Sequence, residues 1–234
     1  MKTVAILQSN YIPWIGFFQL LGHVDEFIFF DDMQFTKRDW RNRNRIKTSN
    51  GVAWLSIPVK TSGKYLQSIN EVVIADQSWS KKHWKSIELN YKKSCFFEKE
   101  SDWLKQIYAQ NLEHLTDINQ SFIRAICEKL DIKTKLAHQS TANYSTDKNL
   151  RLIEICKDRA ATRYVSGQAA KDYIIPDTFE ENGISLEWFE YPEYPAYSQP
   201  WGPHEKNLSI IDAILNIGSE ETAKIIKDRD KNHG

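Results

Sequence analysis

The chain opens with short apolar runs separated by a stretch of helical spacing. Residues 4–8 and 26–30 are mostly apolar and of strand length, and apolar positions recur at helical spacing through residues 16–24. Two such strands joined by a helix form a β-α-β unit, which implies a parallel sheet and a right-handed crossover. The beginning of the chain therefore predicts an α/β fold.

This rhythm is interrupted between residues 34 and 130. The sequence TSNG at residues 48–51 is typical of a hairpin turn between two strand-like segments. The predicted hairpin strands cover residues 44–47 and 53–59. Residues 78–130 are predicted to be mostly helical, with Ser78 and Ser101 as helix N-caps. We interpret residues 34–130 as an insertion in which a β-hairpin is followed by helices.

Alternation of strands and helices resumes after the insertion. The predicted strands cover residues 133–138, 163–165 and 185–189, and the predicted helices cover residues 148–160, 168–173, 207–217 and 220–227. Residues 191–203 contain four Pro, which predicts an irregular, ordered loop or lid. The pattern favours a single α/β domain over residues 1–234, with a doubly wound, mostly parallel Rossmann-like sheet that carries the hairpin and the helical insertion.

Charge is balanced over the chain but concentrated in one segment. The 31 Lys and Arg residues equal the 31 Asp and Glu residues, which argues against general nucleic-acid binding, because that needs a basic excess over a whole face. Residues 37–47, however, hold six Lys or Arg against one Asp. Arg41, Arg43 and Arg45 alternate there with Asn42 and Asn44, so an extended strand would place three guanidinium groups on one face.

Two interpretations of this basic segment remain open. The guanidinium groups could bind a phosphate or carboxylate, with Lys37 nearby and Trp40 as an apolar wall. Alternatively, the segment is a solvated edge strand whose charges prevent aggregation. Trp40 and the flanking apolar residues favour the first interpretation, because a purely solvating strand does not need them.

Ligands of open parallel sheets lie beyond the carboxyl ends of the strands, so residues that follow strands are candidates. The candidates after the first strand are Gln8, Asn10, Tyr11, Trp14 and Gly16, the last at a helix start where backbone N–H groups could meet an anion. Those after the second are Asp31 and Asp32, and those after a later strand are Ser166 and Gly167. Alternatively, Gly16 is an ordinary turn residue, and Asp31 or Asp32 pairs with Lys37 or Arg41.

Other catalytic chemistry has less support in the sequence. His83, between Trp79 and Trp84, is the best candidate for acid–base work, with a surface or capping role as the alternative. Asp31 and Asp32 have no His or further acid at ligand spacing, so no metal site is expected. No serine or cysteine nucleophile is indicated, which favours direct transfer between two bound substrates.

The expected setting is a reducing cytoplasm. Cys95, Cys127 and Cys156 are few and widely spaced, so a disulfide framework is not expected. No apolar run has the length of a membrane span, and the chain begins with a strand-like sequence rather than a signal peptide. We expect neither nucleic acid nor direct membrane insertion.

Several long motifs resemble one known family nearly end to end. They are AILQSNYIPWIGFFQL, DEFIFFDDMQFTKRDWRNRNRIKT, WLSIPVK, RYVSGQAAKDY and NLSIIDAILN. On these motifs the chain resembles the WbqC-like family of bacterial proteins. Members of that family occur with genes for surface polysaccharide, especially O-antigen, and some are described as glycine or aminoacyl transferases that act on amino sugars.

A more distant resemblance concerns the first loop. The segment PWIGF is similar to the opening of nucleotidyltransferases that carry an HxGH motif, whose two histidines bind the transferring phosphate. Trp14 and Phe17 stand where those histidines would be, while Gly16 remains. The resemblance implies a nucleotide pocket, and the missing imidazoles argue against nucleotidyl transfer.

Together these features predict acyl or aminoacyl transfer, of glycyl type, onto a nucleotide-activated amino sugar. Lys37, Arg41 and Arg43 would bind a diphosphate or a phosphopantetheine donor, with Asn42 beside them. Asp31 or Asp32 would hold or deprotonate the amine, and Trp14, Trp40 and Tyr194 would form apolar walls. The donor would be of coenzyme A or acyl-carrier-protein type, with no cofactor fixed by the sequence. The alternatives are an altered nucleotidyltransferase and a sugar-nucleotide-binding protein without catalytic activity.

Overall fold

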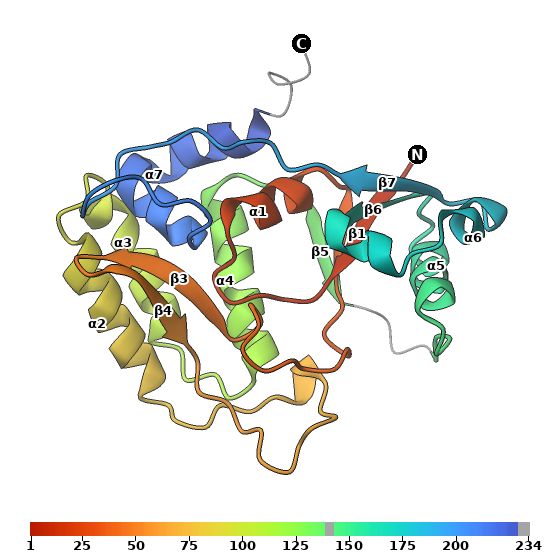
Figure 1. Cartoon of the computed structure of the whole chain (residues 1–234), viewed down its shortest axis with the longest axis horizontal. Helices are drawn as coiled ribbons and strands as arrows, with labels where there is room; N and C mark the ends of the chain where they lie inside the picture. The colour runs from red at the N-terminus through yellow and green to blue at the C-terminus, as the bar shows by residue number, and fades with distance from the viewer. Residues whose placement is uncertain (139–142, 229–234) are drawn as a thin grey trace. The chain divides into compact units, whose positions relative to one another are not determined.

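The computed structural model describes residues 1–138 and 143–228, and Figure 1 shows the path of the chain. Those residues form a five-stranded parallel sheet, a separate two-stranded antiparallel hairpin, seven α-helices and two short 3₁₀ helices. The predicted α/β fold with an inserted hairpin and helices is confirmed. No helix in this described part of the chain is both long enough and apolar enough to cross a membrane.

The chain forms two compact units, and neither is a continuous stretch of sequence. The unit that we call the sheet unit contains Met1–Leu7, Gln19–Phe30 and Lys133–Pro192. The unit that we call the helical unit contains Gln8–Phe18, Asp31–Ile132 and the chain from Glu193 onward. The single domain expected from the sequence stays a prediction.

The sheet unit contains all five parallel strands. They are β1 (Thr3–Leu7), β2 (Glu26–Phe29), β5 (Lys135–His138), β6 (Arg163–Gly167) and β7 (Ser185–Phe189). Their order is β5-β2-β1-β6-β7, so the strand order reverses between β1 and β6, as a doubly wound sheet requires. Strands β1 and β6 are parallel neighbours, with Val4 beside Tyr164. Their carboxyl ends therefore lie at the same edge of the sheet.

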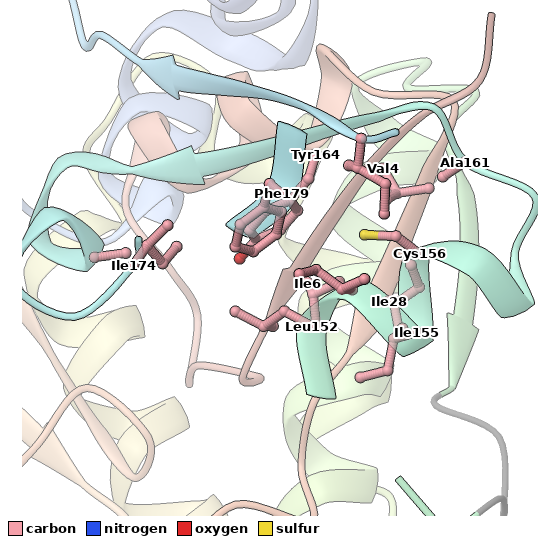
Figure 2. Close-up of a cluster of buried hydrophobic side chains, with 13 residues drawn as sticks. Val4, Ile6, Ile28, Leu152, Ile155, Cys156, Ala161, Tyr164, Ile174 and Phe179 are labelled. Carbon is pink, nitrogen blue, oxygen red and sulfur yellow. The ribbon is translucent and has the colours of Figure 1, made fainter. Parts of the chain in front are cut away.

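One face of this sheet is covered by α5 (Lys148–Asp158) and α6 (Pro176–Glu181), as Figure 2 shows. Val4 and Ile6 alternate along β1 toward this face, where they meet Leu152 and Cys156 of α5. Burial of each such aliphatic side chain contributes about 1.5–3 kcal/mol. The core therefore results from a period of two in the strands and a helical period in α5.

The helical unit contains the hairpin and most of the helices. Its elements are β3 (Arg43–Thr48), β4 (Gly51–Ser56), η1 (Ile69–Glu71), α2 (Trp79–Tyr91), α3 (Phe97–Tyr108), α4 (Leu115–Lys129) and α7 (Ile210–Lys227). The helix α1 (Ile15–Gly22) begins in this unit. In the hairpin, Asn44, Ile46 and Leu55 are buried on the inner face, which fixes the register.

Some predicted element ends were wrong. Ser101 is not an N-cap, because α3 already begins at Phe97, with Glu98 and Glu100 favouring its amino-terminal turn. Ser78 is the N-cap residue of α2, although its side chain does not bond the helix backbone. Residues 207–209 precede α7, in which Gly218, at φ +83°, separates the two predicted helices.

Two predictions around the later loops have different outcomes. Residues 168–172 form the 3₁₀ helix η2 (Gln168–Asp172), not an α-helix, and Ser166 and Gly167 are the last two residues of β6. Residues 191–203 contain no regular helix or strand, so the predicted irregular loop is confirmed. A role for that loop as a lid stays a prediction.

Candidate functional site

Arg41 lies beside the loop that follows β1. Its two terminal nitrogens donate to the side-chain oxygens of Gln8 and Asn10. The two segments are also joined through their backbones, because Tyr11 N–H donates to Trp40 O at 3.1 Å. Three of the predicted binding residues therefore meet within the helical unit, and we call Gln8, Asn10 and Arg41 the exit-loop site.

The charge of Arg41 is only partly balanced inside the protein. A carboxylate oxygen of Asp39 lies 3.8 Å from Nη2. Burial lowers the pKa of Arg41, and the charges of Asp39 and Asp31 act in the opposite direction. Among the described residues, Nε of Arg41 has no hydrogen-bond partner. Because that Nε is buried, the donors left for an anion are the second N–H of each terminal nitrogen.

Asp31 lies buried beneath the exit loop. Its Oδ1 accepts from the backbone N–H of Ser9 at 2.7 Å, and its Oδ2 accepts from the Thr116 hydroxyl and from Gln120 Nε2. All three donors are neutral groups. The carboxylate therefore ties the loop after β1 to the first turns of α4, which is the geometry of a positioning group. Asp32, the second predicted acid, is partly buried.

Asn119 strengthens the same connection. This side chain is fully buried, and its Nδ2 donates to Arg41 O at 2.9 Å and to Ser9 Oγ at 3.2 Å. Thr116, Asn119 and Gln120 share one face of α4, because they are three and four residues apart. The sequence reasoning missed this face. Its signal was a polar patch inside an otherwise apolar helical pattern.

His83 is part of a buried hydrogen-bonded network. Its Nδ1 lies 2.9 Å from the hydroxyl of Tyr11, which in turn lies 2.5 Å from the hydroxyl of Tyr108. Burial lowers the pKa of His83 to about 4, so the imidazole is neutral at pH 7. Burial also raises the pKa of Tyr11 and of Tyr108. The predicted surface or capping alternative for His83 is wrong, since the ring is only 7% exposed.

The exit loop also stores backbone strain. Ile12, a buried β-branched residue, has φ +36°, a conformation that such residues rarely adopt. Its carbonyl accepts from Asn44 Nδ2 at 2.8 Å and from Ser209 Oγ at 2.7 Å. Strained residues held by several hydrogen bonds are frequent at binding and catalytic sites. The loop is therefore fixed in one geometry by residues from distant parts of the sequence.

Trp14 and Gly16 lie against each other. A Cβ atom on Gly16 would stand 2.4 Å from two atoms of the Trp14 ring. The ring of Tyr194 packs edge-on against Trp14, with centroids 5.7 Å apart. The absence of a side chain at Gly16 is thus explained by the position of Trp14. Phe17, at the second histidine position of the HxGH comparison, is buried.

Arg43 and Arg45 contact other residues than Arg41 does. Both project from the outer face of the hairpin, where Trp54 stands opposite Arg45. The expectation that Arg41 shares their strand face is wrong, because the chain turns at residues 41 and 42 before β3 begins. Asn42 instead pairs with Ile57, donating from Nδ2 to its carbonyl at 2.8 Å. Lys37 is exposed.

Ser166 and Gly167 belong to the sheet unit. Ser166 is buried, and its hydroxyl accepts from Tyr164 at 3.4 Å. A Cβ atom on Gly167 would stand 3.6 Å from the Tyr191 hydroxyl, which is an ordinary contact. A role for these two residues in ligand binding stays a prediction.

Possible metal ligands and the three cysteines can be placed in the described residues. Within residues 1–138 and 143–228, no group of three or more His, Cys, Asp or Glu side chains could hold a metal ion. Burial raises the pKa of Cys127 and of Cys156 to about 12, so both thiols are protonated at neutral pH. Cys95 belongs to residues 78–130, which were predicted to be mostly helical, but it is exposed in the turn between α2 and α3.

Comparison with known proteins agrees with the motifs. The sequence profile of the WbqC-like protein family matches residues 8–224. The chain is also 46% identical over 221 residues to "Uncharacterized protein Rv1507c" of Mycobacterium tuberculosis (strain ATCC 25618 / H37Rv), which covers 94% of this chain and 96% of the relative. No solved structure gives a significant match. The chain belongs to the WbqC-like protein family.

Proposed function

We propose that the protein binds a nucleotide-activated amino sugar and transfers an acyl or aminoacyl group to the sugar amine during assembly of a bacterial surface polysaccharide. One observation carries this proposal: two neutral amides hold Arg41 in the loop after β1, and among the described residues Asp39, at 3.8 Å, is its one ion-pair partner. A cation fixed in this way suits a diphosphate, which accepts hydrogen bonds from several guanidinium nitrogens.

Two further cations of residues 37–43 add positive charge for this substrate. Lys37 is exposed, and Arg43 forms no ion pair with any residue in the described ranges. With Arg41, these side chains provide three positive charges for the two or three negative charges of a sugar nucleotide. The whole chain remains neutral, which favours a small anion over a nucleic acid.

The chemical step needs a base more than a nucleophile. The sugar amine attacks the carbonyl carbon of the acyl donor, the amine loses a proton to the base, and the bond from the carbonyl to the leaving group breaks. Asp31 already accepts three hydrogen bonds, and His83 accepts from or donates to Tyr11 in a buried network. We assign a positioning role to Asp31, and we propose that Asp32, the second acid predicted from the sequence, is the base.

The acyl donor is a thioester of coenzyme A or of a carrier protein, and the reaction takes place in the cytoplasm. Burial and the high pKa of Cys127 and of Cys156 argue against these two thiols as nucleophiles. Trp14 and Tyr194, whose rings pack edge to face, form an apolar wall for the sugar.

The experiment is an incubation of the whole protein with a uridine diphosphate amino sugar and a glycyl or acyl thioester, followed by mass spectrometry. The expected product is the sugar nucleotide enlarged by one acyl or aminoacyl group. Asp32→Asn should lower its rate of formation at least about a hundredfold, because general bases contribute about 10²–10⁴-fold. Asp117→Asn, which changes an exposed acid of α4, should leave the rate unchanged.

Two results would contradict the proposal. Binding of the sugar nucleotide without product, for every thioester supplied, would indicate a binding protein without catalytic activity. Magnesium-dependent release of pyrophosphate from a nucleoside triphosphate and a sugar phosphate would indicate a nucleotidyltransferase.

A further inference from the structure

The outer face of the hairpin carries two exposed tryptophans between two arginines. The rings of Trp40 and Trp54 lie 5.4 Å apart at an angle of 39°, and 41% and 44% of these residues are exposed. The Arg43 guanidinium lies 4.1 Å above the centre of the Trp54 ring. The Arg45 guanidinium lies 5.7 Å from the Trp40 ring and 5.8 Å from the Trp54 ring. We call these four residues the Trp–Arg platform.

The two arginines of the platform lack a negative partner. Arg43 donates from Nη2 to the backbone carbonyl of Arg38, and Arg45 donates from Nη2 to the carbonyl of Asn207 at 2.9 Å. In the described part of the chain, neither guanidinium forms an ion pair, and Nε of each has no hydrogen-bond partner. Each cation is therefore oriented by one carbonyl and by aromatic contacts; its Nε is buried, and the remaining N–H groups of Nη1 and Nη2 are the donors left for a ligand.

A purely structural role leaves the exposure of the rings unexplained. The inner face of the same hairpin already supplies the packing, through Asn44, Ile46 and Leu55. Trp54 stands directly opposite Arg45, so the strand register alone brings indole and guanidinium together. Arg43 covers one face of the Trp54 ring, and the exposed parts of the two indoles leave an apolar surface beside positive charge. A planar ring that carries an anion matches both parts of this surface.

We propose that the Trp–Arg platform is the nucleotide-recognition subsite: the base of a nucleoside diphosphate stacks on Trp40 and Trp54, and its phosphates bind Arg43 and Arg45. This deepens the proposed function, on which it rests, because it identifies the nucleotide half of the substrate as the part that the hairpin recognises. Stacking accepts any base, since every base has a π face. A single pair of indoles on a chain without net charge fits one nucleotide and not a strand of nucleic acid.

The test is calorimetric titration of the whole protein with uridine diphosphate, uridine and inorganic pyrophosphate. The platform predicts that uridine diphosphate binds at least about tenfold more tightly than either fragment. Trp54→Ala should weaken uridine diphosphate binding about tenfold or more, because stacking is lost, and should weaken pyrophosphate binding less, because the carbonyls of Arg38 and Asn207 still hold the two arginines. Trp54→Phe should retain part of the affinity. Arg45→Ala should weaken both phosphate-containing ligands.

The matched charge control is Lys81→Ala, which removes an exposed cation of α2 and should change none of these affinities. Circular dichroism of each variant checks that the fold is retained. The inference is overturned if Trp54→Ala binds uridine diphosphate like the wild type, or if a short single-stranded RNA binds through Trp54 while nucleoside diphosphates do not. Trp54-dependent nucleotide binding without any transfer would contradict the proposed function alone. Transfer that is insensitive to Trp54 would contradict this inference alone.

Discussion

The hydroxyl of Tyr11 lies 2.9 Å from Nδ1 of His83, which connects the loop after β1 to α2 through a fully buried hydrogen bond. Tyr11 is adjacent to Asn10 of the exit-loop site. Protonation of His83 should therefore change both the free energy of unfolding and the geometry of that site.

The low pKa of His83 makes stability depend on pH. The folded-state pKa of about 4 lies below the ordinary value of 6.5, so between these values the unfolded state binds more protons than the folded state. Stability should therefore fall as the pH drops from about 6.5 to about 4, by roughly 3 kcal/mol from this residue. Urea unfolding at about pH 7 and about pH 4.5 measures the difference.

His83→Gln is the matching variant, because glutamine can still accept from Tyr11 but does not titrate. Its stability should change less across that pH interval than the stability of the wild type. Equal pH dependence in the two proteins would show that the imidazole does not stay neutral in the folded state.

Asp31→Asn tests the positioning role of the buried acid. The amide would place N–H donors against at least one of the donors from Ser9, Thr116 and Gln120. We expect a loss of about 2–4 kcal/mol in the free energy of unfolding, since buried hydrogen bonds to a charged group are lost. Chemical unfolding is the measurement, with Asp117→Asn as the exposed control on the same helix. If Asp31→Asn is as stable as the wild type, Asp31 does not have the positioning role that we assign to it.

Gly16→Ala should force the Trp14 ring to move. The new Cβ would stand 2.4 Å from that ring, so we expect a loss of about 1–3 kcal/mol in stability. The same substitution in a Trp14→Ala background should cost far less, because the obstacle is gone. A double-mutant cycle of thermal unfolding gives the coupling between the two positions. Additive effects would contradict the contact.

Lys47 tethers the irregular loop of residues 191–203. Its buried ammonium donates to the Gln199 side chain at 3.2 Å and to the carbonyls of Gly202 and Pro203. Lys47→Met should leave these acceptors without a donor, lower stability by about 2–4 kcal/mol and accelerate proteolysis within the loop. Lys224→Met, which removes an exposed ion pair with Glu221 of α7, should leave the cleavage rate unchanged. Equal cleavage of both variants would argue against the tether.

The sequence was most informative where a pattern is local. The strand Ser185–Phe189 and the hairpin turn at residues 48–51 follow from alternation and turn residues, and both lie where they were predicted. The prediction of Ser101 as an N-cap was wrong because a serine can stand inside a helix as well as before it. The acidic residues of the first turn of α3 lie upstream of Ser101.

The candidate site was less accessible to prediction, because its contacts join distant parts of the chain. Thr116 is 85 residues away from Asp31, and Asn119 is 110 residues away from Ser9. No local pattern pairs them. The basic segment was recognised from its composition, but the turn that sends Arg41 to Gln8 and leaves Arg43 beside Trp54 depends on tertiary contacts.

The most direct test of the central claim is calorimetric titration of a uridine diphosphate amino sugar into the wild type and into Arg43→Ala, with Lys81→Ala as the charge control. If the guanidinium groups of this segment bind the diphosphate, the wild type binds the sugar nucleotide, and Arg43→Ala weakens binding by about 2 kcal/mol or more, roughly thirtyfold in Kd. The same affinity in the wild type and in Arg43→Ala would contradict the account.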